Sequence, residues 1–350
     1  MPEALKAVST LSAMKLPMEF GPLLVAWQRK HGRHELPWQN TQDPYHVWLS
    51  EIMLQQTQVT TVLAYYQRFL QRFPTVADLA AASLDEVLAM WQGLGYYSRA
   101  RNLHRCAVVV AARPDGAFPR TAVELAELPG IGRSTAAAIA AFCFRERVAI
   151  LDGNVKRVLT RLLAFEGDMA SSAQEKLLWK HAEALLPDEG ITAYTQGLMD
   201  LGSSICSTRS PQCLLCPVSE LCSARAAGET ERYPVKTRKL KRGRRENWWL
   251  WLENPAGEVL LQQRPETGVW AGLWTLPLFD DEAALLLAAE GLEPEVLPRI
   301  EHALTHFDWI LHPRRAVLTN GYQAAGVGQW VAREKLASYA LPAPLKKLLG

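Results

Sequence analysis

The hydrophobic positions between Phe20 and Ser223 recur with helical spacing almost throughout. Pro44 marks a helix start, and the segment Thr57–Phe73 predicts one helix that ends before Pro74. The run Ser83–Glu86 has the composition of an N-terminal capping box, which predicts the start of another helix. Because no alternating strand pattern stands out in this half, the sequence predicts an all-α first domain.

The pattern changes after Tyr233 and Pro234. Two short apolar runs, Trp248–Leu252 and Glu258–Gln263, flank a turn-forming sequence and predict a β-hairpin. An Ala- and Leu-rich helix is expected over Asp281–Glu290. These elements predict a smaller α+β domain of roughly a hundred residues.

A chain of 350 residues exceeds the usual single-domain range, so two domains are expected. We predict a flexible leader over 1–18, a helical domain over 19–225, a basic linker over 226–245 and the α+β domain over 246–350. Seven of the ten residues in Lys236–Arg245 are basic. Such a run cannot form a core, so it either remains a solvated tether or lies along phosphates.

The overall composition is that of a water-soluble protein, with 49% hydrophobic and 21% charged residues. No apolar run reaches eighteen residues, and no charged-then-apolar signal opens the chain, so we expect a cytoplasmic protein that is not exported. The net charge of +2 neither demands nor excludes a polyanionic partner. Of six cysteines, Cys106 and Cys143 lie in apolar segments and are expected to be packing residues in a reducing compartment.

The other four cysteines follow a helical stretch with the spacing C-x6-C-x2-C-x5-C. Four thiolates from one short loop predict a bound metal centre, for which a [4Fe–4S] cluster is the leading hypothesis and a structural Zn²⁺ the alternative. Its expected ligands are Cys206, Cys213, Cys216 and Cys222.

The segment Leu128–Ala136 lies between two predicted helices, Thr121–Leu128 and Ser134–Phe144, and is interpreted as a helix–hairpin–helix. Gly130 and Gly132 let the backbone approach a ligand, and the amides of the second helix form an anion site. DNA phosphate is the expected ligand. The alternative is a tight connection between two helices that needs glycine but binds nothing. Phosphate contacts would position DNA without reading its sequence.

Several segments together resemble the adenine-specific DNA glycosylases of the MutY family, within the endonuclease III superfamily. The resemblance covers almost the whole chain. It is carried by residues 32–39 (GRHELPWQ), 48–59 (WLSEIMLQQTQV), 93–104 (GLGYYSRARNLH), 128–136 (LPGIGRSTA), 150–159 (ILDGNVKRVL), 199–206 (MDLGSSIC) and the four cysteines. It implies base excision repair of double-stranded DNA in which adenine is mispaired with 8-oxoguanine or guanine. A monomer is expected, and the lack of a targeting leader fits a bacterial cytoplasm, with association to the nucleoid through DNA.

Two carboxylates are the expected catalytic groups. The apolar neighbours of Glu51 predict a raised pKa, and the resemblance implies that Glu51 protonates adenine and then helps to activate water. Asp152 has the position of an N-cap, and the resemblance places it beside the sugar, where it stabilises positive charge. Ser134 stands where the strand-cutting relatives carry a lysine, so we expect a monofunctional glycosylase without a strong lyase step.

The resemblance also assigns the residues that would hold DNA and the everted base. Arg33, Leu36, Trp38 and Gln196 are expected in the adenine pocket. Gln56, Thr57, Leu94 and Tyr96 match the positions that wedge into DNA, and Lys156 is expected to contact phosphate. For Trp38 and Leu94, ordinary packing is the alternative.

The second domain resembles the Nudix-like domain with which MutY-family proteins recognise 8-oxoguanine. Leu304, Thr305 and His306 match the recognition loop, with Leu where the family has Phe. The Ala- and Leu-rich helix lacks the glutamates with which a Nudix hydrolase holds Mg²⁺, so no such hydrolysis is expected. Two alternatives stay open: an endonuclease III-like pyrimidine glycosylase with lyase activity, and a non-catalytic DNA-binding protein.

Overall fold

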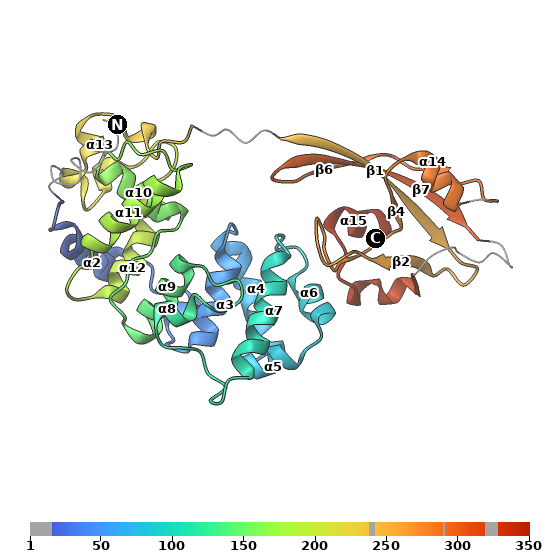
Figure 1. The fold of residues 1–350 in the computed structure, drawn as a ribbon, viewed down its shortest axis with the longest axis horizontal. Helices are drawn as coiled ribbons and strands as arrows, with labels where there is room; N and C mark the ends of the chain where they lie inside the picture. Colours follow the sequence, from blue (N-terminus) through green and yellow to red (C-terminus); the bar gives the residue numbers. More distant parts are fainter. Residues whose placement is uncertain (1–15, 238–241, 290, 319–327) are drawn as a thin grey trace, which may run out of the picture. The chain divides into compact units, whose positions relative to one another are not determined.

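The computed structural model describes residues 16–237, 242–289, 291–318 and 328–350, coloured along the chain in Figure 1. The chain forms two compact units, each built from two stretches of sequence. The first unit comprises the residues up to 52 together with 117–239, and the second comprises 53–116 together with 240–350. Most of the predicted leader and residues 238–241 of the predicted basic linker lie outside the described residues.

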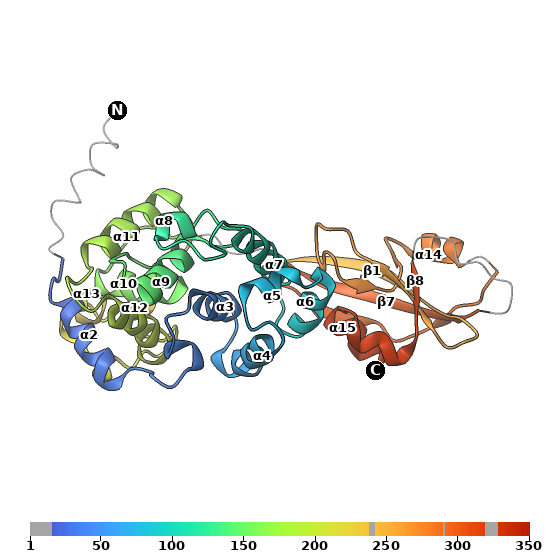
Figure 2. The same cartoon turned by 90° about the horizontal axis from the view of Figure 1, so that it is seen from below.

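The first unit is helical. Its helices are α2 (Phe20–His31), α3 (Pro44–Leu54, which runs to the border of the second unit), α8 (Ala122–Leu125), α9 (Arg133–Phe144), α10 (Gly153–Leu162), α11 (Ser172–Ala184), α12 (Ile191–Asp200) and α13 (Ser223–Ala226). Figure 2 shows α2 and α12 side by side, where Phe20 meets Tyr194 edge to face at 6.1 Å. Both rings are almost fully buried, so this contact forms part of the core that supports the site described below.

Four further helices belong to the second unit. They are α4 (Val59–Arg72), α5 (Val76–Ala81), α6 (Leu84–Trp91) and α7 (Ser98–Ala111). The helix predicted over Thr57–Phe73 is therefore present but begins two residues later. The Ser83 hydroxyl accepts a hydrogen bond from the Glu86 amide at 3.2 Å, which confirms the predicted helix start.

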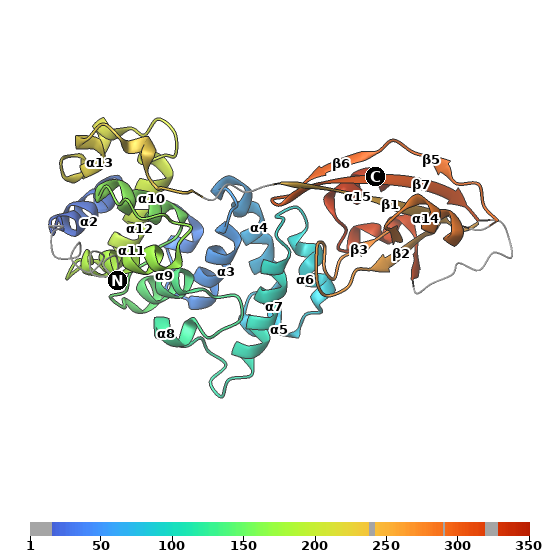
Figure 3. The same ribbon diagram turned by 45° about the horizontal axis from the view of Figure 1, so that its top comes forward.

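The sheet of the second unit has eight strands: β1 (Gly243–Glu253), β2 (Val259–Gln263), β3 (Trp274–Thr275), β4 (Leu278–Phe279), β5 (Glu295–Val296), β6 (Ile300–Ala303), β7 (Phe307–Val317) and β8 (Gln329–Val331). Strands β1 and β7 are parallel along their full lengths and lie side by side in Figure 3. The predicted hairpin is confirmed as the antiparallel pair β1 and β2. Strand β1 begins at Gly243, inside the segment expected to be linker.

Two more helices complete the second unit, α14 (Glu282–Ala288) and α15 (Ala343–Leu349). Helix α14 packs on β1 and β4 and lies within the predicted range, with Asp281 as its N-cap. Cys106 and Cys143 are both buried, as expected for packing residues. Within the described residues, no helix is long and apolar enough to cross a membrane.

Candidate active site

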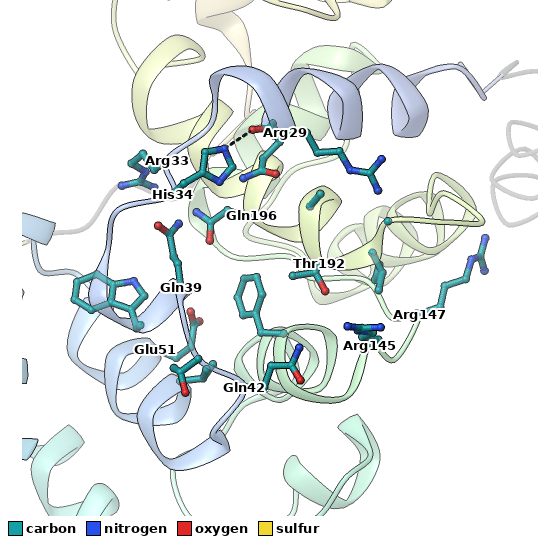
Figure 4. A pocket seen from close by; sticks show the side chains of 18 of the residues that line it. Arg29, Arg33, His34, Gln39, Gln42, Glu51, Arg145, Arg147, Thr192 and Gln196 are labelled. Carbon is teal, nitrogen blue, oxygen red and sulfur yellow. Dashed lines mark hydrogen bonds between the residues drawn. The ribbon is translucent and has the colours of Figure 1, made fainter. Parts of the chain in front are cut away.

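A cavity of about 640 Å³ opens in the first unit between α3, α12 and the segment that follows α2. Figure 4 shows Glu51, Gln39 and Gln196 around it, each contributed by a different segment of the chain. Arg145 and Arg147 lie on its opposite side. The cavity has the size of a small-molecule site, and its lining mixes apolar and polar side chains.

Glu51 lies in α3 on the wall of this cavity. Its neighbours Trp48 and Leu49 are fully buried, so the carboxyl sits at the edge of an apolar core. Burial, together with the nearby negative charge of Asp152, raises the pKa of Glu51 to about 8. Such a carboxyl keeps its proton at neutral pH and can act as a general acid.

Asp152 is the N-cap of α10, as the sequence predicted. Its Oδ1 accepts a hydrogen bond from the Val155 amide at 2.7 Å. Burial raises the pKa of Asp152, while the hydrogen bonds from the Val155 and Asn154 amides and the charges of Arg157 and Lys156 oppose this rise. Asp152 does not line the cavity, but its negative charge acts on Glu51, so the fold places the two predicted carboxylates within electrostatic range of each other.

Ser134 lies in the first turn of α9. Its hydroxyl accepts a hydrogen bond from the Leu151 amide at 3.0 Å. This bond ties the end of the hairpin to the residue that precedes Asp152. Ser134 therefore supports the loop that carries Asp152, and its side chain has no amine that could attack the sugar.

The two hairpin glycines differ in conformation. Gly130 has a φ of 76°, which favours glycine, whereas Gly132 is extended and forms the N-cap of α9. Apart from Gly132 itself, the residues on either side of it and the adjoining helix backbone, no atom of the described chain lies within 4 Å of the position where a Cβ of Gly132 would stand. The space above Gly132 is therefore open to a ligand at the helix N-terminus.

Three of the four residues predicted for the adenine pocket line the cavity with Glu51, namely Arg33, Trp38 and Gln196. Leu36 does not; it lines a smaller hollow of about 340 Å³ formed by residues 32–36. Sequence reasoning missed two further side chains here. Gln39 lines the cavity, and Asp200 receives hydrogen bonds from Arg33 and Gln196.

Lys156, predicted to contact phosphate, donates a hydrogen bond to Glu175 of α11 at 2.6 Å. The Glu183 carboxylate on the same helix pairs with Arg133 at 2.5 Å. Arg133 also lies over the ring of Trp179 at 3.9 Å. Helix α11 therefore pairs with two basic side chains, Arg133 beside the hairpin and Lys156 near Asp152.

The residues predicted to wedge into DNA lie in two loops of the second unit. Arg99, 8% exposed, donates hydrogen bonds to the Met53 and Gln55 carbonyl oxygens at 2.9 and 2.6 Å. Its other nitrogen donates to the Leu94 and Gly95 carbonyl oxygens at 3.2 and 3.3 Å. The Arg99 guanidinium thus joins the loop of Gln56 and Thr57 to the loop of Leu94 and Tyr96. No local sequence pattern predicted this contact.

The predicted lesion-recognition residues Leu304, Thr305 and His306 connect β6 to β7. They line a second cavity of about 530 Å³ with Tyr96 and Trp270. The Tyr96 hydroxyl is 3.3 Å from the Thr305 hydroxyl. A predicted wedge residue and the predicted recognition loop are therefore neighbours within the second unit.

The four spaced cysteines line one small cavity of the first unit. The pKa of Cys216 rises to about 11, mainly through burial and also through the charges of Cys206, Cys213 and Cys222. Arg161 donates a hydrogen bond to the Cys206 sulfur at 3.4 Å. Four converging thiols fit a thiolate-ligated centre, although no group of three or more side chains in the described ranges already has metal-binding geometry.

Comparison with known proteins agrees with this architecture. Residues 49–184 match the family model of HhH-GPD superfamily base excision DNA repair proteins, and residues 248–350 match the NUDIX domain. An adenine DNA glycosylase of Buchnera aphidicola (from Acyrthosiphon pisum) is 33% identical, with 94% of this chain and 96% of the relative covered. The chain belongs to the adenine DNA glycosylase family.

Other adenine DNA glycosylases match as well. The human enzyme is 32% identical, with 93% of this chain and 72% of the relative covered. Among solved structures, a thermostable thymine-DNA glycosylase is 29% identical with a TM-score of 0.52, covering 59% of this chain and 95% of that one. An endonuclease III in a DNA complex, 24% identical with a TM-score of 0.51, shares the fold.

The predicted architecture, a helical glycosylase domain followed by a Nudix-like domain, is confirmed. Like other adenine DNA glycosylases, the protein is a DNA glycosylase, a hydrolase of N-glycosyl bonds.

Proposed function

We propose that this adenine DNA glycosylase removes adenine mispaired with 8-oxoguanine or guanine from double-stranded DNA, as a monomer and without cutting the strand. The observation that carries the proposal is the buried Glu51 carboxyl on the wall of a cavity large enough for a purine, where burial raises its pKa to about 8. A protonated carboxyl at this place suits the one proton that the leaving base requires.

The reaction follows from the two carboxylates. Glu51 donates its proton to N7 of the everted adenine, and the C1′–N9 bond breaks with its electron pair moving to the base. The deoxyribose is left as an oxocarbenium-like cation, which the Asp152 carboxylate stabilises. Water then adds to C1′ and gives a proton back to Glu51, so the products are free adenine and an abasic site.

Ser134 supports the monofunctional part of the proposal. Strand cleavage through a Schiff base needs an amine that attacks C1′, and the serine hydroxyl instead accepts the Leu151 amide. Lys156, the nearest lysine along the chain to Asp152, is engaged by Glu175. An adduct trapped efficiently by borohydride would contradict this assignment.

One assay tests the function as a whole. A duplex with adenine opposite 8-oxoguanine is incubated with the protein, and free adenine and strand breaks are measured before and after hot alkali. We expect adenine release with breaks that appear only after alkali. Breaks without alkali favour the endonuclease III-like alternative, and bound but intact DNA favours a non-catalytic binding protein.

The hairpin and the second unit would provide the grip on DNA. We assign phosphate binding to the backbone around Gly130 and Gly132, and to Lys156 once DNA displaces Glu175. Leu304, Thr305 and His306 would receive 8-oxoguanine in the 530 Å³ cavity, next to the wedge residue Tyr96. Helix α14 carries only one glutamate, Glu282, which pairs with Arg314, so this domain is assigned recognition and not hydrolysis.

We further propose that Cys206, Cys213, Cys216 and Cys222 hold a [4Fe–4S] cluster. When bound, the cluster would supply a covalent staple for the loop, and no step of base excision passes through it. Purified protein should be brown and absorb in the blue, with about four iron atoms per chain. Colourless protein with stoichiometric zinc would support the structural Zn²⁺ alternative. The cytoplasmic, nucleoid-associated location expected from the sequence stays a prediction.

A further inference from the structure

We propose that Asp200 is a positioning residue that selects adenine by fixing the direction of the Gln196 side-chain amide. The inference rests on the proposed function and adds a reason why the pocket distinguishes an amino-purine from an oxo-purine. Asp200 does not line the cavity itself. It acts on two side chains that do, Arg33 and Gln196.

Asp200 is the last residue of α12 and is only 2% exposed. Its Oδ1 accepts hydrogen bonds from Arg33 Nε at 2.6 Å and from Gln196 Nε2 at 2.8 Å. Its Oδ2 accepts the Arg33 backbone amide at 3.0 Å. Three donors from two segments, far apart in the sequence, therefore converge on one buried carboxylate.

This arrangement leaves Gln196 no choice of orientation. A carboxylate only accepts hydrogen bonds, so the amide must turn its nitrogen towards Asp200. Gln196 lies one helical turn before Asp200, which keeps the two side chains on one face of α12. The Gln196 Oε1 is then the end of the amide that remains for the cavity.

An acceptor at this position matches the chemistry of adenine. The exocyclic N6 group of adenine donates hydrogen bonds, whereas the O6 atom of guanine or hypoxanthine only accepts them. A fixed acceptor can accept a hydrogen bond from the adenine N6 group. The O6 atom of guanine or hypoxanthine would instead face another acceptor oxygen and form no hydrogen bond. Polar sites of this kind reject the wrong partner strongly because buried groups are left unpaired.

The backbone around Asp200 is itself held by hydrogen bonds, which keeps the carboxylate in position beside Arg33 and Gln196. Its carbonyl oxygen accepts hydrogen bonds from the Ser203 and Ser204 hydroxyls at 3.1 and 2.7 Å. The chain then continues as a π-helical turn, Leu201–Ile205, which leads directly to Cys206. Helix turns of this kind often mark functional positions, and here the turn fixes where α12 ends.

The test compares two duplexes that carry adenine or hypoxanthine opposite 8-oxoguanine, in single-turnover excision by the full-length protein. Asp200→Asn keeps the size of the side chain but replaces one acceptor oxygen with a donor, so the Gln196 amide is no longer fixed. We expect the adenine rate to fall by roughly tenfold or more and the hypoxanthine rate to fall less, so that the preference for adenine shrinks.

A double variant separates positioning from general damage. If Asp200 acts through Gln196, then Asp200→Asn made in a Gln196→Ala background should leave the adenine preference of that background unchanged. An equal fall of both rates in Asp200→Asn, with the preference intact, would overturn the proposal. So would a further loss of preference in the double variant.

Gln196→Ala alone provides the same readout if Asp200→Asn does not fold, as judged by circular dichroism. Removal of the amide should reduce the adenine preference by a similar factor, and an undiminished preference would overturn the inference. Failure of the wild-type protein to release adenine would contradict the proposed function instead, so the two failures are distinguishable.

Discussion

Glu51 and Asp152 are the same kind of group in two different settings. Glu51 lies on a helix wall next to fully buried apolar residues, and burial is the main cause of its raised pKa. Asp152 caps a helix, and amide hydrogen bonds and two basic neighbours oppose the effect of burial. Burial raises the pKa of both carboxyls, but only at Asp152 do amide hydrogen bonds and positive charges favour the charged form. This contrast favours Glu51 as the proton donor and Asp152 as the anionic partner of the sugar.

Glu51→Gln should have the largest effect of the variants considered. The amide keeps the shape of the side chain but cannot give up a proton, so excision should fall by roughly 10²–10⁴-fold. Single-turnover release of adenine measures the loss, and binding to a duplex with an abasic-site analogue serves as the control. A rate near that of the wild type would remove Glu51 from the mechanism.

Asp152→Asn should rank next. Asparagine is also a good N-cap, so the helix start survives while the negative charge beside the sugar is lost. We expect excision to fall by roughly 10²–10³-fold, with thermal unfolding shifted by only a few degrees. A large loss of stability with only a small loss of rate would mean that Asp152 serves the fold alone.

The dependence of stability on pH tests the setting of Glu51 without any substrate. The folded-state pKa of Glu51 is about 8, against 4.5 for the ordinary group, so the native state binds the proton more tightly than the unfolded state. The wild type should therefore lose stability as the pH rises from about 4.5 through about 8. Glu51→Gln should remove this part of the slope and stabilise the protein at pH 9 by on the order of 1–3 kcal/mol. Urea unfolding at pH 5 and pH 9 tests the sign, and equal slopes in both proteins would contradict it.

Ser134→Ala should have the smallest effect. It removes the acceptor of the Leu151 amide and loosens the loop that ends at Asp152, at a cost of about 1 kcal/mol. Excision should fall by less than roughly tenfold, with no strand cleavage gained. Ser134→Thr keeps the hydroxyl and is the matched control. An excision loss as large as that of Asp152→Asn would give the serine a direct role.

Local patterns accounted for much of the fold and for part of the site. The helix caps at Ser83 and Asp152 follow from residue type and spacing, and the β1–β2 hairpin follows from two apolar runs around a turn. The convergence of four cysteines on one cavity also follows from their spacing. Each of these signals joins residues that are close in the sequence.

The missed features join residues that are far apart. Asp200 meets Arg33 across 167 positions, and Arg99 reaches Met53 across 46. The parallel pairing of β1 with β7 likewise joins distant strands. A buried polar group must find partners somewhere, but a single sequence does not say where. The sequence placed Lys156 at a phosphate contact, and only the fold revealed that Glu175 pairs with it.

Arg99 has a consequence for how this protein can vary. It binds carbonyl oxygens of the main chain in both loops, and every residue type presents that atom. Substitutions at Leu94 or Gln55 therefore leave their carbonyl bonds to Arg99 available, so these side chains can change while Arg99 still joins the two loops. Arg99 itself cannot be exchanged for lysine without loss, because a single ammonium lacks the forked guanidinium geometry that bonds to both loops at once.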